Sequence, residues 1–290
     1  MEIKSSELII NPDGSVYHLN IKPEDLATNI ILVGDQNRVE KVSAHFDTIE
    51  FETQKREFKT HTGTYKGKRF TVISTGIGPD NIDIVINELD ALVNIDFKTR
   101  QIKKALTSLN LIRFGTSGSL QANIPVDSIV ASEYTIGLDN MMRSYVIDNE
   151  SATEIEDAFI KHTNWDLRKG RPYVFKGSDY LAEKFRGLEG VFPGFTATAG
   201  GFYGPQGRVL RLPIQDTELN QKMDNFNFNG INISNLEMET SAIYGLSKLL
   251  GHNALSLNAI IANRANGTFS QDPYKIVEKV IELGLKKLAE

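Results

Sequence analysis

Short β-rich runs alternate with helical periods along most of this chain, and this alternation limits what it can fold into. Residues 29–33 form an apolar run that precedes the helical period 38–45, and the apolar run 231–236 precedes the helical period 240–250. Strands that alternate with helices predict an α/β sheet with helices on both faces. The expected strands are 29–33, 69–75, 109–114, 128–134, 195–199, 231–236 and 254–262, and the expected helices are 38–45, 82–92, 240–250 and 273–288.

The length and composition of the chain allow one sizeable core. The 290 residues are 40% hydrophobic, which is enough for one large α/β domain. No internal repeat or low-complexity linker divides the sequence, and the charged stretch 96–104 and the polar stretch 148–170 predict solvated surface helix or loop. We therefore expect residues 1–290 to form a single domain.

Charge and cysteine content exclude several classes of protein. A net charge of -5 without a long basic run argues against a nucleic-acid partner, since phosphate-backbone binding needs a basic face. The absence of cysteine excludes disulfides and thiolate nucleophiles and suits a reducing compartment. No segment approaches the roughly 18 apolar residues of a membrane span, and the N-terminus has no apolar signal core. We expect a cytoplasmic protein without a membrane partner.

Glycines and arginines gather where the expected strands end. Gly34 and Arg38 follow the first strand, the motif at residues 113–118 closes the third, and Asn263 and Arg264 close the last. In such sheets ligands bind beyond the carboxyl ends of the strands. Glycine lets backbone N–H groups approach an anion, and arginine supplies a planar fork of donors. A single arginine is more typical of a surface ion pair, but the joint placement favours an oxyanion site.

The motif Glu237-Met238-Glu239 lies between an apolar strand and a helix. Burying two carboxylates in such a place is energetically unfavourable unless each has a polar partner. The vicinal diol of a ribose would supply two hydroxyl donors, and the thioether of Met238 would lie against the carbon face of the sugar. The alternative interpretation is that both acids only complement the dipole of the following helix.

Other known motifs fit poorly. Gly76-Ile77-Gly78 follows a strand but lacks the third glycine of a dinucleotide-binding loop, because Asn81 stands there, and no phosphate-loop Lys-Ser/Thr pair occurs. The five histidines have no metal-ligand spacing, so we expect no metal site of that type. No Gly-x-Ser-x-Gly motif supports a Ser-His-Asp triad.

Taken together, these segments resemble the nucleoside phosphorylase family, and most closely its uridine phosphorylase branch. The motifs follow one order over most of the chain, and only residues 96–108 and 139–191 are poorly covered. The resemblance rests on residues 16–19, 32–41, 56–58, 74–78, 113–118, 202–203, Gln206, Arg208, 237–239 and 263–264.

The resemblance implies a mixed sheet that forms a distorted barrel flanked by helices, and phosphorolysis of a pyrimidine nucleoside, uridine first, to free base and ribose 1-phosphate. By position, the phosphate would be held by Gly34, Arg38, Arg113 and Thr116, with Arg56 from a neighbouring subunit. The ribose would be held by Glu237, Met238 and Glu239 with His18 of the neighbour, and the base by Phe202, Gln206, Arg208 and Arg264. The residues expected to carry the reaction are Arg113, Arg208 and Glu239.

No covalent nucleophile and no cofactor is required by this chemistry, because phosphate is itself a substrate and the charges that develop on ribose and base are stabilised electrostatically. Some relatives hold a potassium ion between subunits with a Glu, a backbone carbonyl and a Ser. Glu57 and Ile77 match the first two ligands, whereas Asn81 takes the place of the Ser, so a structural potassium ion stays open.

Departures from the family pattern lie in the base loop. Gly204-Pro205 stands where the family usually has Pro-Gly, Gly207 stands where uridine phosphorylases commonly have Glu, and Gly200-Gly201 replaces a more polar pair. We expect this loop to be freer, which leaves the preference among uridine, deoxyuridine and thymidine open.

Three other functions stay open. The purine branch would place a Ser-Asp pair after the last strand, where this chain has Asn263-Arg264. A nucleosidase would use water and would not need Arg38, Arg56 and Arg113. A non-catalytic nucleoside-binding or sensing protein would explain departures confined to the base pocket.

Overall fold

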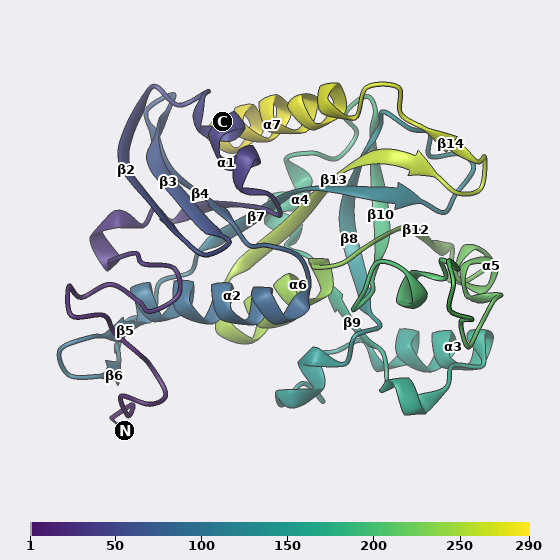
Figure 1. The fold of residues 1–290 in the computed structure, drawn as a ribbon, viewed down its shortest axis with the longest axis horizontal. Helices are drawn as coiled ribbons and strands as arrows, with labels where there is room; N and C mark the ends of the chain where they lie inside the picture. Colours follow the sequence, from purple (N-terminus) through teal and green to yellow (C-terminus); the bar gives the residue numbers. More distant parts are fainter. Residues whose placement is uncertain (1) are drawn as a thin grey trace.

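A computed structural model describes residues 2–290 and contains one large mixed sheet flanked by helices (Figure 1). All seven predicted strands are present. They are β1 (Asn29–Val33), β4 (Lys68–Ser74), β7 (Asn110–Ser119), β8 (Ile129–Gly137), β10 (Val191–Thr198), β12 (Ile231–Glu237) and β13 (Asn253–Asn263).

The sheet closes on itself, as a distorted barrel requires. Its main path runs β12-β10-β8-β13-β7-β1-β4, and β12 also pairs with β7, so that five strands form a ring. The closing contact is antiparallel and pairs Leu236 with Gly118 and Asn235 with Ser119. The predicted α/β architecture with a distorted barrel is therefore confirmed.

Strand β7 is longer than predicted. The sequence placed its end at Phe114, but β13 pairs with it from Asn110 to Ser119 and keeps it extended through the glycine-rich motif. Only its first part, up to Arg113, pairs with β1. Arg113 therefore lies inside β7 rather than at its end, level with the carboxyl end of β1.

Four main helices cover the two faces of the sheet (Figure 1). The apolar run of β1 alternates between them, because successive side chains of a strand point to opposite faces. Ile31 and Val33 pack in the core beneath α1 and α7, whereas Ile30 and Leu32 pack in the core beneath α2 and α6. The helices are α1 (Gln36–Ser43), α2 (Pro79–Asn94), α6 (Thr240–Leu250) and α7 (Pro273–Ala289).

Several elements were not predicted. The strands β2 (Thr48–Lys55) and β3 (Phe58–Tyr65) form a hairpin at one edge of the sheet, and the stretch 96–104 contains a short hairpin instead of a helix or loop. In the stretch 148–170, α3 (Thr153–Thr163) is a surface helix, but Glu156 on it is buried and paired with Arg143 and Arg171. The remaining elements are β5 (Ile95–Asp96), β6 (Gln101–Ile102), β9 (Tyr173–Lys176), α4 (Asp179–Glu183), α5 (Leu219–Asp224), β11 (Asn227–Phe228) and β14 (Thr268–Phe269).

None of the helices between residues 2 and 290 combines the length and the hydropathy that crossing a bilayer would take.

Candidate functional site

A cleft of about 330 Å³ lies where the carboxyl ends of β1 and β12 meet the middle of β7 and the end of β13. It brings together most of the site residues that the sequence predicted. Those that line it are Gly34, Arg38, Arg113, Thr116, Phe202, Gln206, Arg208, Glu237, Met238 and Glu239.

Arg113 is a buried cation, and two of its hydrogen-bond donors have no partner in the described part of the chain. Its Nη2 donates to Glu239 Oε2, and its Nε lies 3.6 Å from Glu237 Oε2. Its Nε and Nη1 are buried and have no hydrogen-bond partner among residues 2–290. Because unsatisfied buried donors are costly, the geometry suits an oxyanion in the cleft beside Arg113.

Gly115 makes room for this arginine. A Cβ atom at Gly115 would lie 3.0 Å from Arg113 Nε and 2.9 Å from Asn258 Oδ1, closer than side chains normally approach. The motif therefore needs glycine at this position so that the guanidinium can fold back along β7.

Arg38 enters the cleft from the first turn of α1. Its Nη1 donates to the backbone oxygen of Phe114 at 3.1 Å. Burial lowers the pKa of Arg38, and the neighbouring Arg113 lowers it further. Two desolvated cations side by side are repelled unless an anion joins them, which again favours an oxyanion at this end of the cleft.

Glu237 is buried and has protein partners for both oxygens. Thr198 Oγ1 donates to its Oε1 at 2.6 Å, and the backbone N–H of Glu239 donates to its Oε2 at 2.9 Å. The backbone N–H of Thr240 donates to both oxygens, at 3.1 and 3.0 Å. Glu237 thus stabilises the N-terminus of α6, which is the role that the alternative interpretation of this motif predicts. A ribose is not needed to satisfy it.

Glu239 links the acidic motif to the glycine motif. Its Oε1 accepts a hydrogen bond from Gly78 N at 2.8 Å, and its Oε2 accepts one from Arg113. Burial raises the pKa of the Glu239 carboxyl, although Arg113 opposes the shift. Gly78 has φ 102°, a backbone conformation that favours glycine. The Gly76-Ile77-Gly78 loop therefore directs an N–H group at a carboxylate of the protein itself.

Gln206 is the most deeply buried polar residue of the base end. It is 2% exposed and ends a one-turn helix, Gly204–Gln206. Arg264 Nη1 donates to its backbone oxygen at 2.8 Å and Arg264 Nη2 donates to its Oε1 at 3.1 Å, while Arg208 Nη1 donates to the same Oε1. Burial, helped by the nearby Arg208, lowers the pKa of Arg264 to about 10.

Arg208 also covers Phe202. The carbon at the centre of its guanidinium lies 3.8 Å from the centroid of the Phe202 ring, a cation–π distance. Burial lowers the pKa of Arg208. The aromatic face expected to pack on a base is therefore occupied by the arginine expected to read it.

Asn220 on α5 is a site residue that the sequence did not reveal. Its Oδ1 accepts a hydrogen bond from Arg264 Nη1 at 3.0 Å. Gly207 has φ 70°, and a Cβ atom there would lie 2.6 Å from Asn220 Nδ2. Gly207 therefore packs closely against Asn220 of α5 in a backbone conformation that favours glycine, and the expectation that the loop is freer stays a prediction. No local sequence signal marks Asn220, because its partner Arg264 is 44 residues away.

His18 and Arg56 do not line the cleft of their own chain. His18 Nδ1 lies 2.6 Å from Glu88 Oε1, and the guanidinium carbon of Arg56 lies 5.9 Å from the ring centroid of Tyr17. The idea that they act in a neighbouring subunit stays a prediction.

The residues matched to a potassium site are Glu57, Ile77 and Asn81, and they do not present a set of free oxygen ligands to a cation. Asn81 Nδ2 donates to the carbonyl of Ile77 at 3.4 Å, so an amide donor occupies the oxygen that the resemblance assigns to potassium. This arrangement does not fit the ion. Residues 2–290 also contain no group of three His, Cys, Asp or Glu side chains that could hold a metal.

A ring-closed mixed sheet with a cleft lined by arginines, paired carboxylates and an amide defines a protein of the nucleoside phosphorylase type. The sequence model of the Phosphorylase superfamily matches residues 28–290, and the chain belongs to this superfamily of enzymes.

Similar proteins include members with different base preferences. A uridine phosphorylase of Thermococcus kodakarensis is 27% identical over 99% of this chain and 91% of its own length. A DeoD-type purine nucleoside phosphorylase of Bacillus thuringiensis is 28% identical over 92% of this chain and 96% of its own length. A solved Trypanosoma brucei nucleoside phosphorylase that shows uridine phosphorylase activity has a TM-score of 0.87 and 30% identity, and the match covers 97% of this chain and 99% of that one.

Proposed function

We propose that this protein cleaves pyrimidine nucleosides, with uridine as the preferred one, and that it uses inorganic phosphate to give free base and ribose 1-phosphate. The observation that carries the proposal is Arg113, which has unpaired buried donors and lines a cleft that also contains Arg38 and the Glu237-Met238-Glu239 motif. One cleft thus offers a place for an anion beside a place for a sugar.

The proposed reaction breaks the bond between the base and C1 of ribose, and the base leaves with the electron pair. A phosphate oxygen then bonds to C1. Arg38 and Arg113 hold the phosphate, which faces the positive charge that develops on the ribose, so that positioning and electrostatics do the work. Glu237, Met238 and Glu239 hold the sugar, and Arg208 stabilises the negative charge on the departing base.

The carbonyl oxygens of uracil suit the groups around Gln206. With Oε1 held by Arg208 and Arg264, the amide N–H groups of Gln206 are directed to an acceptor such as a base carbonyl. The similarity to proteins with uridine phosphorylase activity supports the same choice.

We also propose that the active unit is a homo-oligomer of at least two subunits. His18 and Arg56 are placed outside the cleft of their own chain, and both suit contact with sugar and phosphate when contributed by a neighbour. Neither a cofactor nor a metal ion is needed for the proposed reaction.

A purine nucleoside is the second candidate substrate, because a DeoD-type purine nucleoside phosphorylase is as similar in sequence as the uridine enzymes are. Against it, Asn263-Arg264 offers no acid at the end of β13 to protonate a purine, and Arg264 is bound to Gln206.

The test is release of free base from uridine, deoxyuridine, thymidine, cytidine and inosine, each with and without phosphate. Phosphate-dependent release of uracil from uridine is the expected result. Release that is independent of phosphate would show a nucleosidase, a preference for inosine would show the purine branch, and no release from any nucleoside would show a binding protein.

A further inference from the structure

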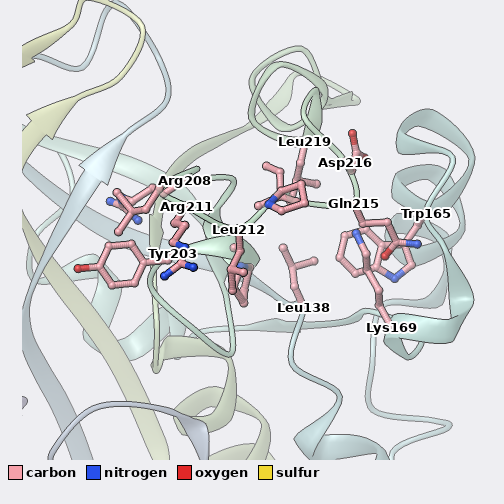
Figure 2. A pocket seen from close by; sticks show the side chains of 15 residues that line it. Leu138, Trp165, Lys169, Tyr203, Arg208, Arg211, Leu212, Gln215, Asp216 and Leu219 are labelled. Atoms are coloured by element: carbon pink, nitrogen blue, oxygen red, sulfur yellow. The ribbon is translucent and has the colours of Figure 1, made fainter.

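A second and larger cavity borders Arg208, which also lines the nucleoside cleft. Its volume is about 680 Å³, and it is lined by the segment from Tyr203 to Leu219 together with Leu138, Trp165 and Lys169. In Figure 2, Arg208 and Arg211 lie at one end of the cavity, and Trp165 with Lys169 lies at the other. None of the predicted roles of the site residues uses this space.

The walls of the cavity are mainly apolar side chains that solvent can reach. Leu210 is 73% exposed and Leu212 is 77% exposed, and both line the cavity beside Pro213 and Ile214. Apolar surface left in contact with water is unfavourable, and contiguous exposed apolar surface commonly marks a binding site. A ligand with an apolar body would remove this surface from water.

Positively charged side chains outnumber negatively charged ones in the lining of the cavity. Arg211 is exposed, and its side chain makes no ion pair or hydrogen bond in the part of the chain that the structure describes. Lys169 Nζ lies 4.9 Å from the ring centroid of Trp165. The acid of the lining, Asp216, is already paired with Lys222 at 2.9 Å. Arg211 therefore lacks a counter-charge at one end of an apolar cavity, and a ligand anion would supply one.

We propose that this cavity is a binding site for an apolar monocarboxylate, with the carboxylate at Arg211 and the hydrocarbon body against Leu210, Leu212 and Trp165. The charge complementarity selects an anion, and the apolar walls exclude a small hydrated one such as acetate. The site is separate from the proposed phosphorolysis and does not rest on it. Arg208 and Tyr203 border this cavity, and Arg208 also lines the nucleoside cleft, so an occupant would touch a residue proposed to read the base.

The single tryptophan of the chain makes the test direct, because Trp165 is the only tryptophan and lines the cavity. Its fluorescence is recorded while decanoate is added to the full-length protein, with the uncharged decanamide as the matched probe. A saturable change in emission, at about tenfold lower concentration for decanoate than for decanamide, is expected. No catalytic activity is needed for this readout, so its result is independent of whether the protein cleaves uridine.

Two variants locate the site. Leu212→Asp places a negative charge on an exposed position of the wall and should abolish saturable binding, whereas Leu106→Asp, at a 64% exposed leucine outside the cavity, should leave it unchanged. Arg211→Gln should weaken decanoate binding about threefold to tenfold, because a partly exposed charge pair contributes modestly, and should not affect decanamide. Equal affinity for decanoate and decanamide, an unsaturable signal, or binding that survives Leu212→Asp would each overturn the proposal.

Discussion

Arg264 holds Gln206 at two points, with one hydrogen bond of 2.8 Å to its backbone oxygen and one of 3.1 Å to its side-chain Oε1. Arg208 donates to the same Oε1. Rotating the amide by 180° would place its N–H groups against two cationic donors, so the orientation of Gln206 is fixed. In the proposed recognition of the base by Gln206, the choice of base therefore depends on an arginine that need not touch the base.

We first predict that Arg264→Ala lowers kcat/KM for uridine by about 10-fold to 100-fold, since hydrogen bonds to charged groups contribute about 1.5–3 kcal/mol. The loss for cytidine should be smaller, because that base gains less from a fixed Gln206 orientation. Asn220→Ala should act in the same direction with a smaller effect. Arg168→Ala is the control, because the Arg168 side chain is 84% exposed and pairs with Asp166. Unchanged discrimination in Arg264→Ala would show that Gln206 is held without it.

The second prediction concerns the base itself. Uracil presents acceptors at O2 and O4 and a donor at N3, whereas cytosine replaces O4 by an amino donor and N3 by an acceptor. Arg208, placed to donate to O4, would meet the amino donor of cytosine, so one group of cytosine is mispaired, at about 1–3 kcal/mol. We expect kcat/KM for uridine to exceed that for cytidine by roughly 5-fold to 150-fold. Values within threefold of each other would contradict the assignment of Gln206 and Arg208.

The sequence predicted the elements whose apolar pattern is strong. The predicted strand 29–33 has the observed bounds of β1 because its residues are buried on both faces, and the predicted helix 240–250 has those of α6. The hairpin of β2 and β3 was missed because β3 buries Thr60, His61 and Thr62, whose side chains give no apolar alternation.

Most of the candidate site residues were predicted and lie at one cleft, but their partners were not. Thr198, Gly78 and Asn220 contact Glu237, Glu239 and Arg264 from elements that are distant along the chain. Such contacts form when the sheet closes, and no local sequence pattern predicts them. The extension of β7 past Phe114 is another case, because pairing with β13 decides it.

The third prediction separates the catalytic role of Arg113 from its structural role. Arg113→Ala should lower the rate of phosphorolysis by roughly 100-fold or more, as loss of other transition-state donors does. It also leaves Glu239 buried without its cation, which should lower the free energy of unfolding by about 3–5 kcal/mol. The double variant Arg113→Met with Glu239→Gln removes the unpaired charge, so it should regain stability without regaining activity. Near-normal phosphorolysis by folded Arg113→Ala would rule out the phosphate role.

The fourth prediction tests whether subunits share sites. Arg56→Ala and Glu239→Gln should each be nearly inactive alone, because each lesion affects every site. In a mixed dimer both lesions fall in one site and leave the other intact, so that mixing should restore up to about a quarter of the activity expected for wild-type protein. Exchange is followed with a size-tagged copy. If mixed dimers form and activity stays at background, Arg56 does not act in the neighbour's site.

The fifth prediction concerns Asp139, which follows β8. Tyr173 donates to both of its oxygens at 2.8 Å and Ser241 donates at 3.2 Å, but burial is the larger effect and raises the pKa of the Asp139 carboxyl. A raised pKa in the folded protein means that folding is favoured when the carboxyl is protonated. The stability that this carboxyl contributes is therefore complete at pH values below its pKa in the unfolded protein. It is lost as the pH rises through its pKa in the folded protein.

Asp139→Asn does not titrate, so its free energy of unfolding relative to wild type should increase as pH rises from 4 to 7.5. Urea denaturation at several pH values measures this slope, and any constant change in hydrogen bonding cancels from it. Asp166→Asn is the opposite control, because a side-chain hydrogen bond from Arg168 lowers the pKa of Asp166. The free energy of unfolding of Asp166→Asn relative to wild type should fall slightly as the pH rises. A flat or falling difference for Asp139→Asn would show that its hydrogen bonds outweigh its burial, and that the carboxyl is ionised in the folded protein at no cost.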